Sequence, residues 1–413
     1  MKKAPRSLRS GKIVVSILSL LCCLLAVHTQ AQNQTENPPE FNPLFVDPAS
    51  RDFSRNPPLL DRIKSSPHGY FRFINAQFSS EVCARLEDIL HRSSAFNLHG
   101  DAHMEQYAIT SLGRGMTDFD DSSTGPAVLD LIRFGVSLHL TCLANNWQDY
   151  YEELFDDFLF GYRRALEDTS FKPIEPTLSK KIRQGFTSNP KAFYAWADSK
   201  MEPIPETDKA ELIEAMKPFI EMMHLEDPRR SPGYFQIEKI GALKMGIGSA
   251  LDLKYLVRFR GNSEKPFDDV IIEIKELRDI SGIDCIISCR TTDPFRVLLG
   301  SSRIAYQPFK HLGYFFFRDK FFWTHSWVEN YKELDVRESF ESVEMLREVV
   351  ADVGAQLGKG HVKHIASPLD VQLRRFQLLF LTKHEQRIKR VCRDLTNLTI
   401  AGWEQFKNEL MSE

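Results

Sequence analysis

The chain has 413 residues, of which 42% are hydrophobic and 26% are charged, as in ordinary soluble globular proteins. This length is sufficient for two domains or for one large two-lobed domain. A formal net charge of −3 argues against a nucleic-acid-binding surface built on gross positive charge, so no nucleic-acid partner is expected.

The first 31 residues predict an export signal peptide. Several basic side chains precede an apolar stretch at 13–27, which is shorter than the ~20 residues of a membrane span. Residues 29–31 then offer a cleavage site for a signal peptidase. We therefore expect an exported protein of the periplasm or cell envelope, in contact with the membrane only if this segment is not cleaved. Residues 32–58, rich in Asn, Pro and Gln, predict a linker or an extended arm.

Outside the signal segment the cysteines are sparse and odd in number, which is not the pattern of a disulfide scaffold. They are Cys83, Cys142, Cys285, Cys289 and Cys392. Cys285 and Cys289 are close enough in sequence to form a disulfide in an oxidising compartment. Most of the five are expected to be small buried hydrophobic side chains, and no group of His and Cys has zinc spacing.

Residues 59–232 are expected to form a helical lobe. Apolar residues at helical spacing predict a helix at 80–91, a buried helix at 128–143 and amphipathic helices at 149–168 and 207–224. The composition changes at 228–233, where we place an internal boundary.

Residues 233–332 are expected to form an antiparallel β-rich lobe, with strands at 234–245, 251–260 and 270–277. Residues 296–327 predict a further strand-rich aromatic segment, whose rings are more often core than a stacking platform. The pattern becomes helical again, so residues 333–413 are expected to be C-terminal helices that pack on the helical lobe.

Two acidic loops flank a short predicted hairpin in the helical lobe. The loops lie at 99–106 and 116–121, and the hairpin consists of an apolar strand at 107–109 and a glycine turn at 113–115. Carboxylates in such loops can accept a proton from a hydroxyl group or hold a divalent metal. One acidic triplet is usually only a solvated turn, but two such loops at close spacing favour a functional site.

A buried carboxylate and a strand lysine add to this pattern. Asp130 in the predicted buried helix must be paired, either with Arg133 or with the backbone of the loop above it. A glycine turn at 246–249 lies between two predicted strands, and Lys275 follows on the third. Glycine lets backbone N–H groups approach phosphates, and a lysine ammonium is a point charge for them. Alone, a G-x-G sequence is usually a tight turn and a strand lysine is usually solvated.

Together these motifs resemble the bacterial family catalogued as DUF2252, which is related to the protein-kinase-like and aminoglycoside-phosphotransferase superfamily. The resemblance extends from Leu59 to His364. Its anchors are short motifs in a defined order, namely Ser66-Pro67, Phe71-Arg72, 100–103, 118–121, Gly125-Pro126, Asp130-Leu131, Arg133, 246–249, Lys275-Glu276, Arg303 and Gln307.

The resemblance implies a role for each matched position, with ATP and Mg²⁺ as cofactors. Asp101 would receive the proton of the acceptor hydroxyl group, and His103 would belong to the same catalytic group. The Mg²⁺ ion would be held by Asp118, Gln106 and Asp120. The phosphates would be bound by Gly246, Gly248, Ser249 and Lys275. Structural support would come from His99, Asp130, Arg133 and Glu276.

The resemblance also implies an α+β, two-lobed protein-kinase-like fold. In ordinary kinases the glycine loop and the lysine precede the catalytic loop, whereas here they follow it. The predicted helix at 353–364 resembles the helix that normally runs into the catalytic loop. We therefore expect a circular permutation, with the helical catalytic lobe first, the β-rich glycine-loop lobe second, and helices that return to the first lobe.

Two features depart from this family pattern. Gln106 stands where these phosphotransferases have a metal-binding Asn, and export would place the protein where ATP is scarce. These features leave two main hypotheses. The first is a phosphotransferase or nucleotidyltransferase that uses Mg-ATP on an unidentified small-molecule or protein hydroxyl group. The second is an exported non-catalytic, pseudokinase-like protein that binds a nucleotide or another anion. A third hypothesis is an envelope scaffold that uses the aromatic residues at 315–323.

Overall fold

The computed structural model describes residues 41–54, 56–90, 95–226, 231, 233–247, 251–263, 268–287, 293–307 and 309–412. The predicted signal peptide at 1–31 lies outside these residues. A compact unit, Pro43–Glu413, contains the described helices and strands, which form a mixed α+β fold. Within the described residues, no helix combines the length and apolarity that a membrane crossing requires.

From Pro43 on, the predicted linker belongs to this compact unit and is not a free arm. Leu44 and Val46 are buried. The Tyr70 hydroxyl group holds their backbone, since it donates a hydrogen bond to the Leu44 carbonyl and accepts one from the Val46 N–H. A short 3-10 helix, η1, follows at Pro48–Ser50. The first α-helices are α2 (Pro57–Lys64), α3 (Pro67–Phe73) and α4 (Asn75–Leu90). Helix α3 begins where Ser66 caps the Gly69 N–H and Pro67 occupies the first turn.

The predicted hairpin is confirmed, but Arg114 and Gly115 of its predicted turn are paired strand residues, so the turn lies earlier. Strands β2 (Tyr107–Thr110) and β3 (Arg114–Met116) pair antiparallel, and β10 (Tyr331–Glu333) joins the other edge of β2. A second small sheet pairs β1 (Phe96–Leu98) with β4 (Ser123–Gly125). These two small sheets hold both acidic loops, and a 3-10 helix, η2 (Met104–Gln106), ends the first loop.

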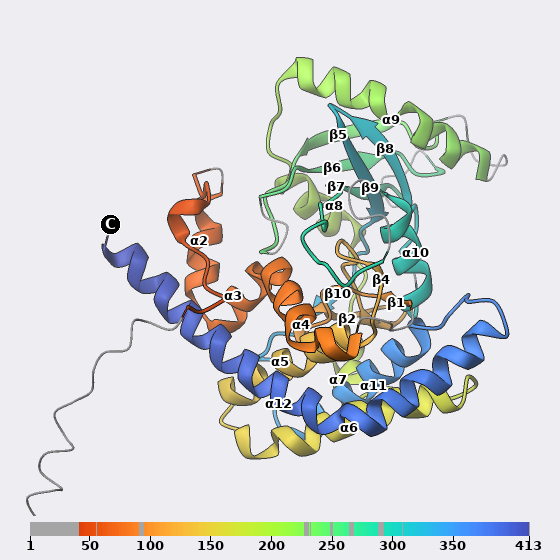
Figure 1. Cartoon of the computed structure of the whole chain (residues 1–413). Coiled ribbons are helices and arrows are strands. Elements are labelled where there is room, and N and C mark those ends of the chain that lie inside the picture. Colours follow the sequence, from red (N-terminus) through yellow and green to blue (C-terminus); the bar gives the residue numbers. More distant parts are fainter. Residues whose placement is uncertain are drawn as a thin grey trace, which may run out of the picture. The chain divides into compact units, whose positions relative to one another are not determined.

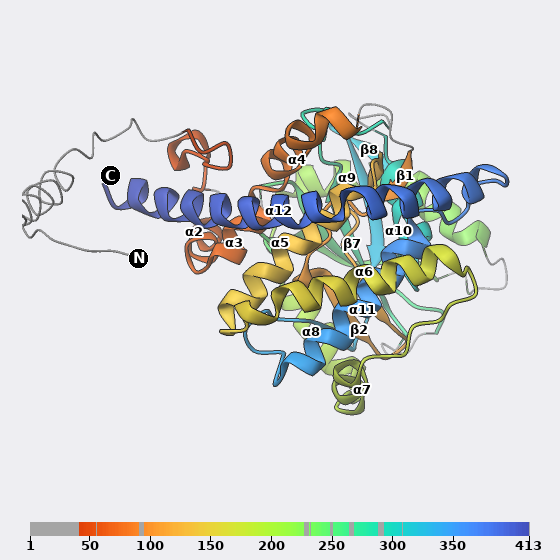
Figure 2. The ribbon, with the colours of Figure 1, turned by 60° about the horizontal axis from the view of Figure 1, so that its bottom comes forward.

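A helical bundle lies below these strands in Figure 1. Its members are α5 (Val128–Ala144), α6 (Tyr151–Glu167), α11 (Val343–Gly360) and α12 (Leu369–Ser412). Helix α5 is the buried helix that the sequence predicts, since nearly all of its side chains are inaccessible. Helices α6 and α11 approach each other closely at Gly354, which has no side chain. A Cβ atom there would clash with the Phe158 carbonyl oxygen. Figure 2 shows the long α12 running along α5 and α6.

The β-rich region forms one five-stranded antiparallel sheet in the order β5-β6-β7-β9-β8. Its strands are β5 (Ile237–Ala242), β6 (Lys254–Phe259), β7 (Val270–Glu276), β8 (Gly313–Phe317) and β9 (Lys320–Ser326). Helix α9 (Glu206–Glu226) packs on one face, over aromatic side chains that include Phe315 and Phe322. Helix α8 (Pro190–Ser199) packs on part of the other face. Helix α7 (Thr177–Gln184) and η3 (Gln148–Tyr150) complete the elements.

The prediction of a strand-rich segment at 296–327 is wrong in its first part, because α10 (Phe295–Ile304) is a helix. Its buried residues are Arg296, Val297, Gly300, Ser301 and Ile304, which recur at the spacing of one helix face. The Arg296 guanidinium also donates hydrogen bonds to the carbonyls of Asp120 and Ser122, which fixes the helix on the second acidic loop.

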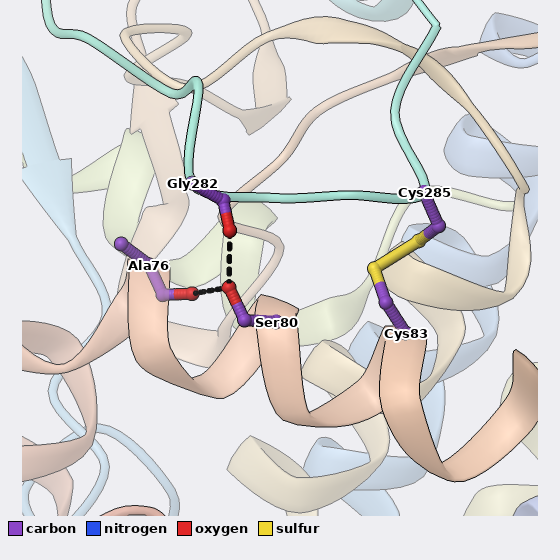
Figure 3. The surroundings of a disulfide bond; sticks show 5 residues. All are labelled: Ala76, Ser80, Cys83, Gly282 and Cys285. Carbon is purple, nitrogen blue, oxygen red and sulfur yellow. Dashed lines mark hydrogen bonds between the residues drawn. A yellow bond between two sulfur atoms is a disulfide. The ribbon is translucent and has the colours of Figure 1, made fainter.

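Cys285 forms a disulfide with Cys83, which lies 202 positions earlier in the chain. This corrects the pairing of Cys285 with Cys289, which lies outside the described residues. Figure 3 shows the bond joining α4 to the segment after β7, and the Ser80 hydroxyl oxygen lies 2.8 Å from the Gly282 carbonyl oxygen beside it. Cys142 and Cys392 are buried free thiols.

Candidate functional site

Lys275 from β7 meets the second acidic loop, although the two are far apart in the sequence. Its Nζ atom lies 2.6 Å from Asp118 Oδ1 and 2.6 Å from Asp120 Oδ2. Asp118 has a φ of +58°, a left-handed conformation that turns the loop at this residue. The loop and the strand therefore bring two carboxylates and one ammonium into direct contact.

The charges of this cluster depend on one another. Burial alone would lower the pKa of Lys275, but Asp118 and Asp120 raise it well above the ordinary value. Burial would raise the pKa of Asp118, yet Lys275 holds it well below the ordinary range. For Asp120, burial and the neighbouring Asp118 raise the pKa to about 7. Lys275 and Asp118 therefore form a charged pair, and Asp120 is the carboxyl group that can carry a proton near neutral pH.

The first acidic loop is fixed by Asp130 in the first turn of α5. The Asp130 carboxylate accepts hydrogen bonds from the backbone N–H groups of His99 (2.7 Å) and Gly100 (2.9 Å), and lies 3.1 Å from His361 Nε2. Gly100 has a φ of +83°, and a Cβ atom there would clash with the Asp121 carbonyl oxygen. The His99 ring bonds the Thr117 carbonyl at 2.8 Å and so connects the two acidic loops.

Of the two partners predicted for Asp130, the loop backbone is confirmed, whereas Arg133 pairs with Asp101. Arg133 Nε donates to Asp101 Oδ1 at 2.9 Å, and the guanidinium stacks on Phe71 at 3.5 Å. Burial opposes ionisation of Asp101, but Arg133 and then His103 hold its pKa below the ordinary value. Only 6% of Asp101 is exposed. Asp101 is therefore a buried carboxylate with a permanent cationic partner.

His103 lies beside this pair. Its Nε2 atom is 3.5 Å from Asp101 Oδ2, and burial lowers its pKa to about 4, so the imidazole is neutral at pH 7. Its ring packs edge-on against His68, which lies 3.3 Å from Glu105. Arg72 bonds the same Glu105 carboxylate at 2.7 Å. The first acidic loop thus rests on a network of carboxylate, histidine and guanidinium side chains.

A cavity of about 540 Å³ opens on the face of the five-stranded sheet that carries Lys275. Of the candidate residues, Asp118, Gly246 and Lys275 line it. Gly248 and Ser249 lie outside the described residues. The remaining candidates do not line the cavity, namely Asp101, His103, Gln106, Asp120, His99, Asp130, Arg133 and Glu276. Glu276 instead accepts a hydrogen bond from the Leu253 N–H and so fixes the segment that enters β6.

The carboxylate oxygens beside Lys275 could hold a Mg²⁺ ion only together with the phosphates of a nucleotide. Among the described residues, no group of three or more His, Cys, Asp or Glu side chains is arranged to hold a metal. However, Mg²⁺ is typically bound by one or two carboxylates together with phosphates and water. Asp118 and Asp120 are two such carboxylates, of which Asp118 lines the cavity, and the Gln106 amide N–H donates a hydrogen bond to Asp118 Oδ2 at 3.2 Å. Lys275 contacts both carboxylates in this structure, so the donor set suits only a metal whose remaining ligands are phosphates and water.

Several site residues were missed because nothing local in the sequence marks them. Arg278 bonds Asp121 at 2.8 Å and reaches Asp252 at 3.3 Å, so it joins the second acidic loop to the segment before β6. Trp323, assigned to the aromatic core, donates its indole N–H to Asp120 at 2.8 Å. Lys254 and Glu273 line the cavity beside Lys275. Glu273 is the exception among these residues, because the alternation of a strand places it on the same face as Lys275.

Comparison with known proteins gives a family match to part of the chain. The model of the family described as "Uncharacterized protein conserved in bacteria (DUF2252)" matches residues 54–192. The match supports the DUF2252 family. The DUF2252 match contains both acidic loops with Asp130 and Arg133, and it ends before the five-stranded sheet. Neither the curated proteins nor the solved structures yield a match to the chain.

Proposed function

We propose that the chain is a kinase-like phosphotransferase that uses Mg-ATP on a hydroxyl acceptor. The observation that carries the proposal is the contact between Lys275 and Asp118 at the cavity. A cavity of about 540 Å³ is within the range of ~300–1,000 Å³ that is usual for small-molecule sites. Phosphoryl transfer requires mainly positioning and neutralisation of charge, and a lysine beside a metal-binding carboxylate supplies both.

The order of the elements supports a circularly permuted kinase-like fold. In protein kinases a glycine-rich loop covers the phosphates and the lysine lies on the third strand. Here the segment with Gly246 lies between β5 and β6, and Lys275 lies on β7, the third strand of the sheet along the chain. The Asn97 N–H, just before the first acidic loop, bonds the His361 carbonyl at 3.0 Å. The end of α11 thus lies next to the start of the first acidic loop. In ordinary kinases a helix leads directly into the corresponding loop.

Each residue of the site would have a separate role. Lys275 would bind the phosphates, while Asp118 and Asp120, with Gln106 beside them, would hold Mg²⁺, which neutralises phosphate charge. Asp101 would orient the acceptor hydroxyl group, and because Arg133 lowers its pKa it is a positioned acceptor more than a strong base. Asp130 would keep the loop of Asp101 in place.

Two observations favour a second candidate, a non-catalytic nucleotide- or anion-binding protein. Asp101 is nearly inaccessible, is bonded to Arg133 and does not line the cavity. The disulfide between Cys83 and Cys285 also suits an oxidising compartment, where ATP is scarce. As a non-catalytic binding protein, the chain would hold a ligand in the cavity and transfer no group from it.

A thermal-shift assay combined with a phosphate-transfer assay tests the proposal and separates the candidates. We expect millimolar Mg-ATP to raise the melting temperature of the protein, since a ligand that binds only the folded state stabilises it. Lys275→Met should remove most of this rise, whereas Lys244→Met, at a half-exposed lysine paired with Glu202, should retain it. Asp101→Asn should abolish the release or transfer of labelled γ-phosphate and keep the rise. A rise without any transfer by the wild type would favour the second candidate, and no rise would contradict both.

A further inference from the structure

Lys254, on β6, is a second buried lysine in the same cavity. It is directly opposite Lys275 in the register of β6 and β7, so both side chains project from one face of the sheet. Both line the cavity, and only 6% of Lys254 and 5% of Lys275 are exposed. Like charges directly opposite each other on neighbouring strands destabilise a sheet. Such a pair therefore needs negative charge from elsewhere.

The two lysines differ in their partners. Lys275 is neutralised by Asp118 and Asp120. Lys254 Nζ donates a hydrogen bond to the Met245 carbonyl at 2.6 Å, and no carboxylate among the described residues lies within 4 Å of it. An ammonium group has three N–H donors, so this bond leaves capacity for a further acceptor. Burial, followed by the charge of Lys275, lowers the pKa of Lys254, which is the sign of an incompletely compensated cation.

The acidic side chains of the cavity wall are engaged with other groups. Glu273 accepts a hydrogen bond from Trp327 at 2.7 Å and lies 3.3 Å from His325. Glu333 accepts one from the Tyr331 hydroxyl group at 2.8 Å. Glu329 accepts one from the Ser188 hydroxyl group at 3.1 Å. In the part of the chain that the structure describes, Glu273 raises the pKa of Lys254 through its charge, but none of these carboxylates forms an ion pair with Lys254, so its ammonium group can still accept a ligand's negative charge.

We propose that Lys254 is a binding residue for a phosphate group of the cavity's ligand, so that the site takes a polyphosphate spanning Lys254 and Lys275. This inference rests on the proposed function and adds to it a second phosphate contact. The same ammonium fixes the Met245 carbonyl, next to Gly246, whose φ of +93° turns the backbone at the cavity wall. Lys254 would therefore connect the bound phosphate to the segment that leads into the predicted glycine turn.

The substitution Lys254→Met should lower the affinity for the ligand without lowering the stability of the ligand-free protein. Because an unpaired buried charge opposes folding, the melting temperature without ligand should be equal to or higher than that of the wild type. The affinity for Mg-ATP and for inorganic tripolyphosphate, measured by titration calorimetry, should fall about tenfold or more, as expected for the loss of a charge-assisted hydrogen bond. A residue with a purely structural role would lower the stability together with the affinity.

Two further variants keep the test decisive. Lys254→Arg should restore affinity, since it keeps the charge, and Lys244→Met should bind as the wild type does. Lys254→Gln, which keeps a hydrogen-bond donor for the Met245 carbonyl, replaces Lys254→Met if the latter does not fold. Wild-type affinity in the methionine or glutamine variant would overturn this inference and leave the proposed function intact. Absence of binding to both probes by the wild type would overturn the proposed function, and this inference with it.

Discussion

Arg133 holds Asp101 by two of its nitrogen atoms, Nε at 2.9 Å and Nη2 at 2.8 Å from the same carboxylate oxygen. The guanidinium is 2% exposed, and its Nη2 also donates to the Phe71 carbonyl at 3.0 Å. The pair thus connects the first acidic loop to α3 and α5. Whether Asp101 acts on a substrate or only anchors its loop, its charge is set by Arg133.

The stabilising effect of this pair should depend on pH in a defined direction. Arg133 lowers the pKa of Asp101 in the folded state below the unfolded value of about 3.9. The stabilisation is therefore complete above that value and is lost as the pH falls further. The difference in unfolding free energy between the wild type and Asp101→Asn should be equal at pH 7 and pH 5.5 and should shrink below about pH 4. Urea unfolding at each pH measures it. A difference that already shrinks between pH 7 and pH 5.5 would show a raised pKa instead.

Gly100→Ala should destabilise the protein severely. The backbone at Gly100 is left-handed, and the added Cβ atom would clash with the Asp121 carbonyl oxygen, so both acidic loops would have to move. We expect a loss of about 1–3 kcal/mol or more in unfolding free energy, measured by urea denaturation. Gly282→Ala is the matched control, because a Cβ atom there meets nothing within 4 Å. Equal effects of the two substitutions would contradict the placement of the loops.

The disulfide between Cys83 and Cys285 should contribute to stability because it closes a long loop in the unfolded chain. Replacing both cysteines by serine should lower the unfolding free energy by about 2–4 kcal/mol. A reductant should have a comparable effect on the wild type and none on the double variant. Peptide mapping without reductant should yield a linked pair of peptides that contain Cys83 and Cys285. A linkage of Cys285 to Cys289 would instead restore the pairing that the sequence alone suggested.

The sequence predicts the elements whose patterns are local. The apolar run at 128–143 becomes α5, and the alternating run at 270–277 becomes β7, because burial on one face or on all faces leaves a periodic trace. Helix α10 shows the limit, since aromatic and branched residues suggested strands although Arg296 and Ile304 share a helix face.

Contacts between distant residues leave no such trace. The partner of Arg133 is Asp101 and the partner of Cys285 is Cys83, whereas the sequence offered Asp130 and Cys289 because they are near neighbours. Lys254 shows the same limit, since its importance appears only when the register places it opposite Lys275. Proximity in sequence was a poor guide wherever the tertiary fold supplied a better partner.

Labelling with an acyl-phosphate derivative of ATP tests the central claim, that a nucleotide binds at the cavity of Lys275 and Asp118. Such a probe transfers its acyl group to a lysine amine near the bound phosphates and releases the nucleotide. The account predicts that peptide mass spectrometry finds the label on Lys254 or Lys275, that excess Mg-ATP prevents it, and that half-exposed Lys244 reacts equally with and without ATP. Label confined to exposed lysines and unaffected by ATP would contradict a nucleotide site in this cavity.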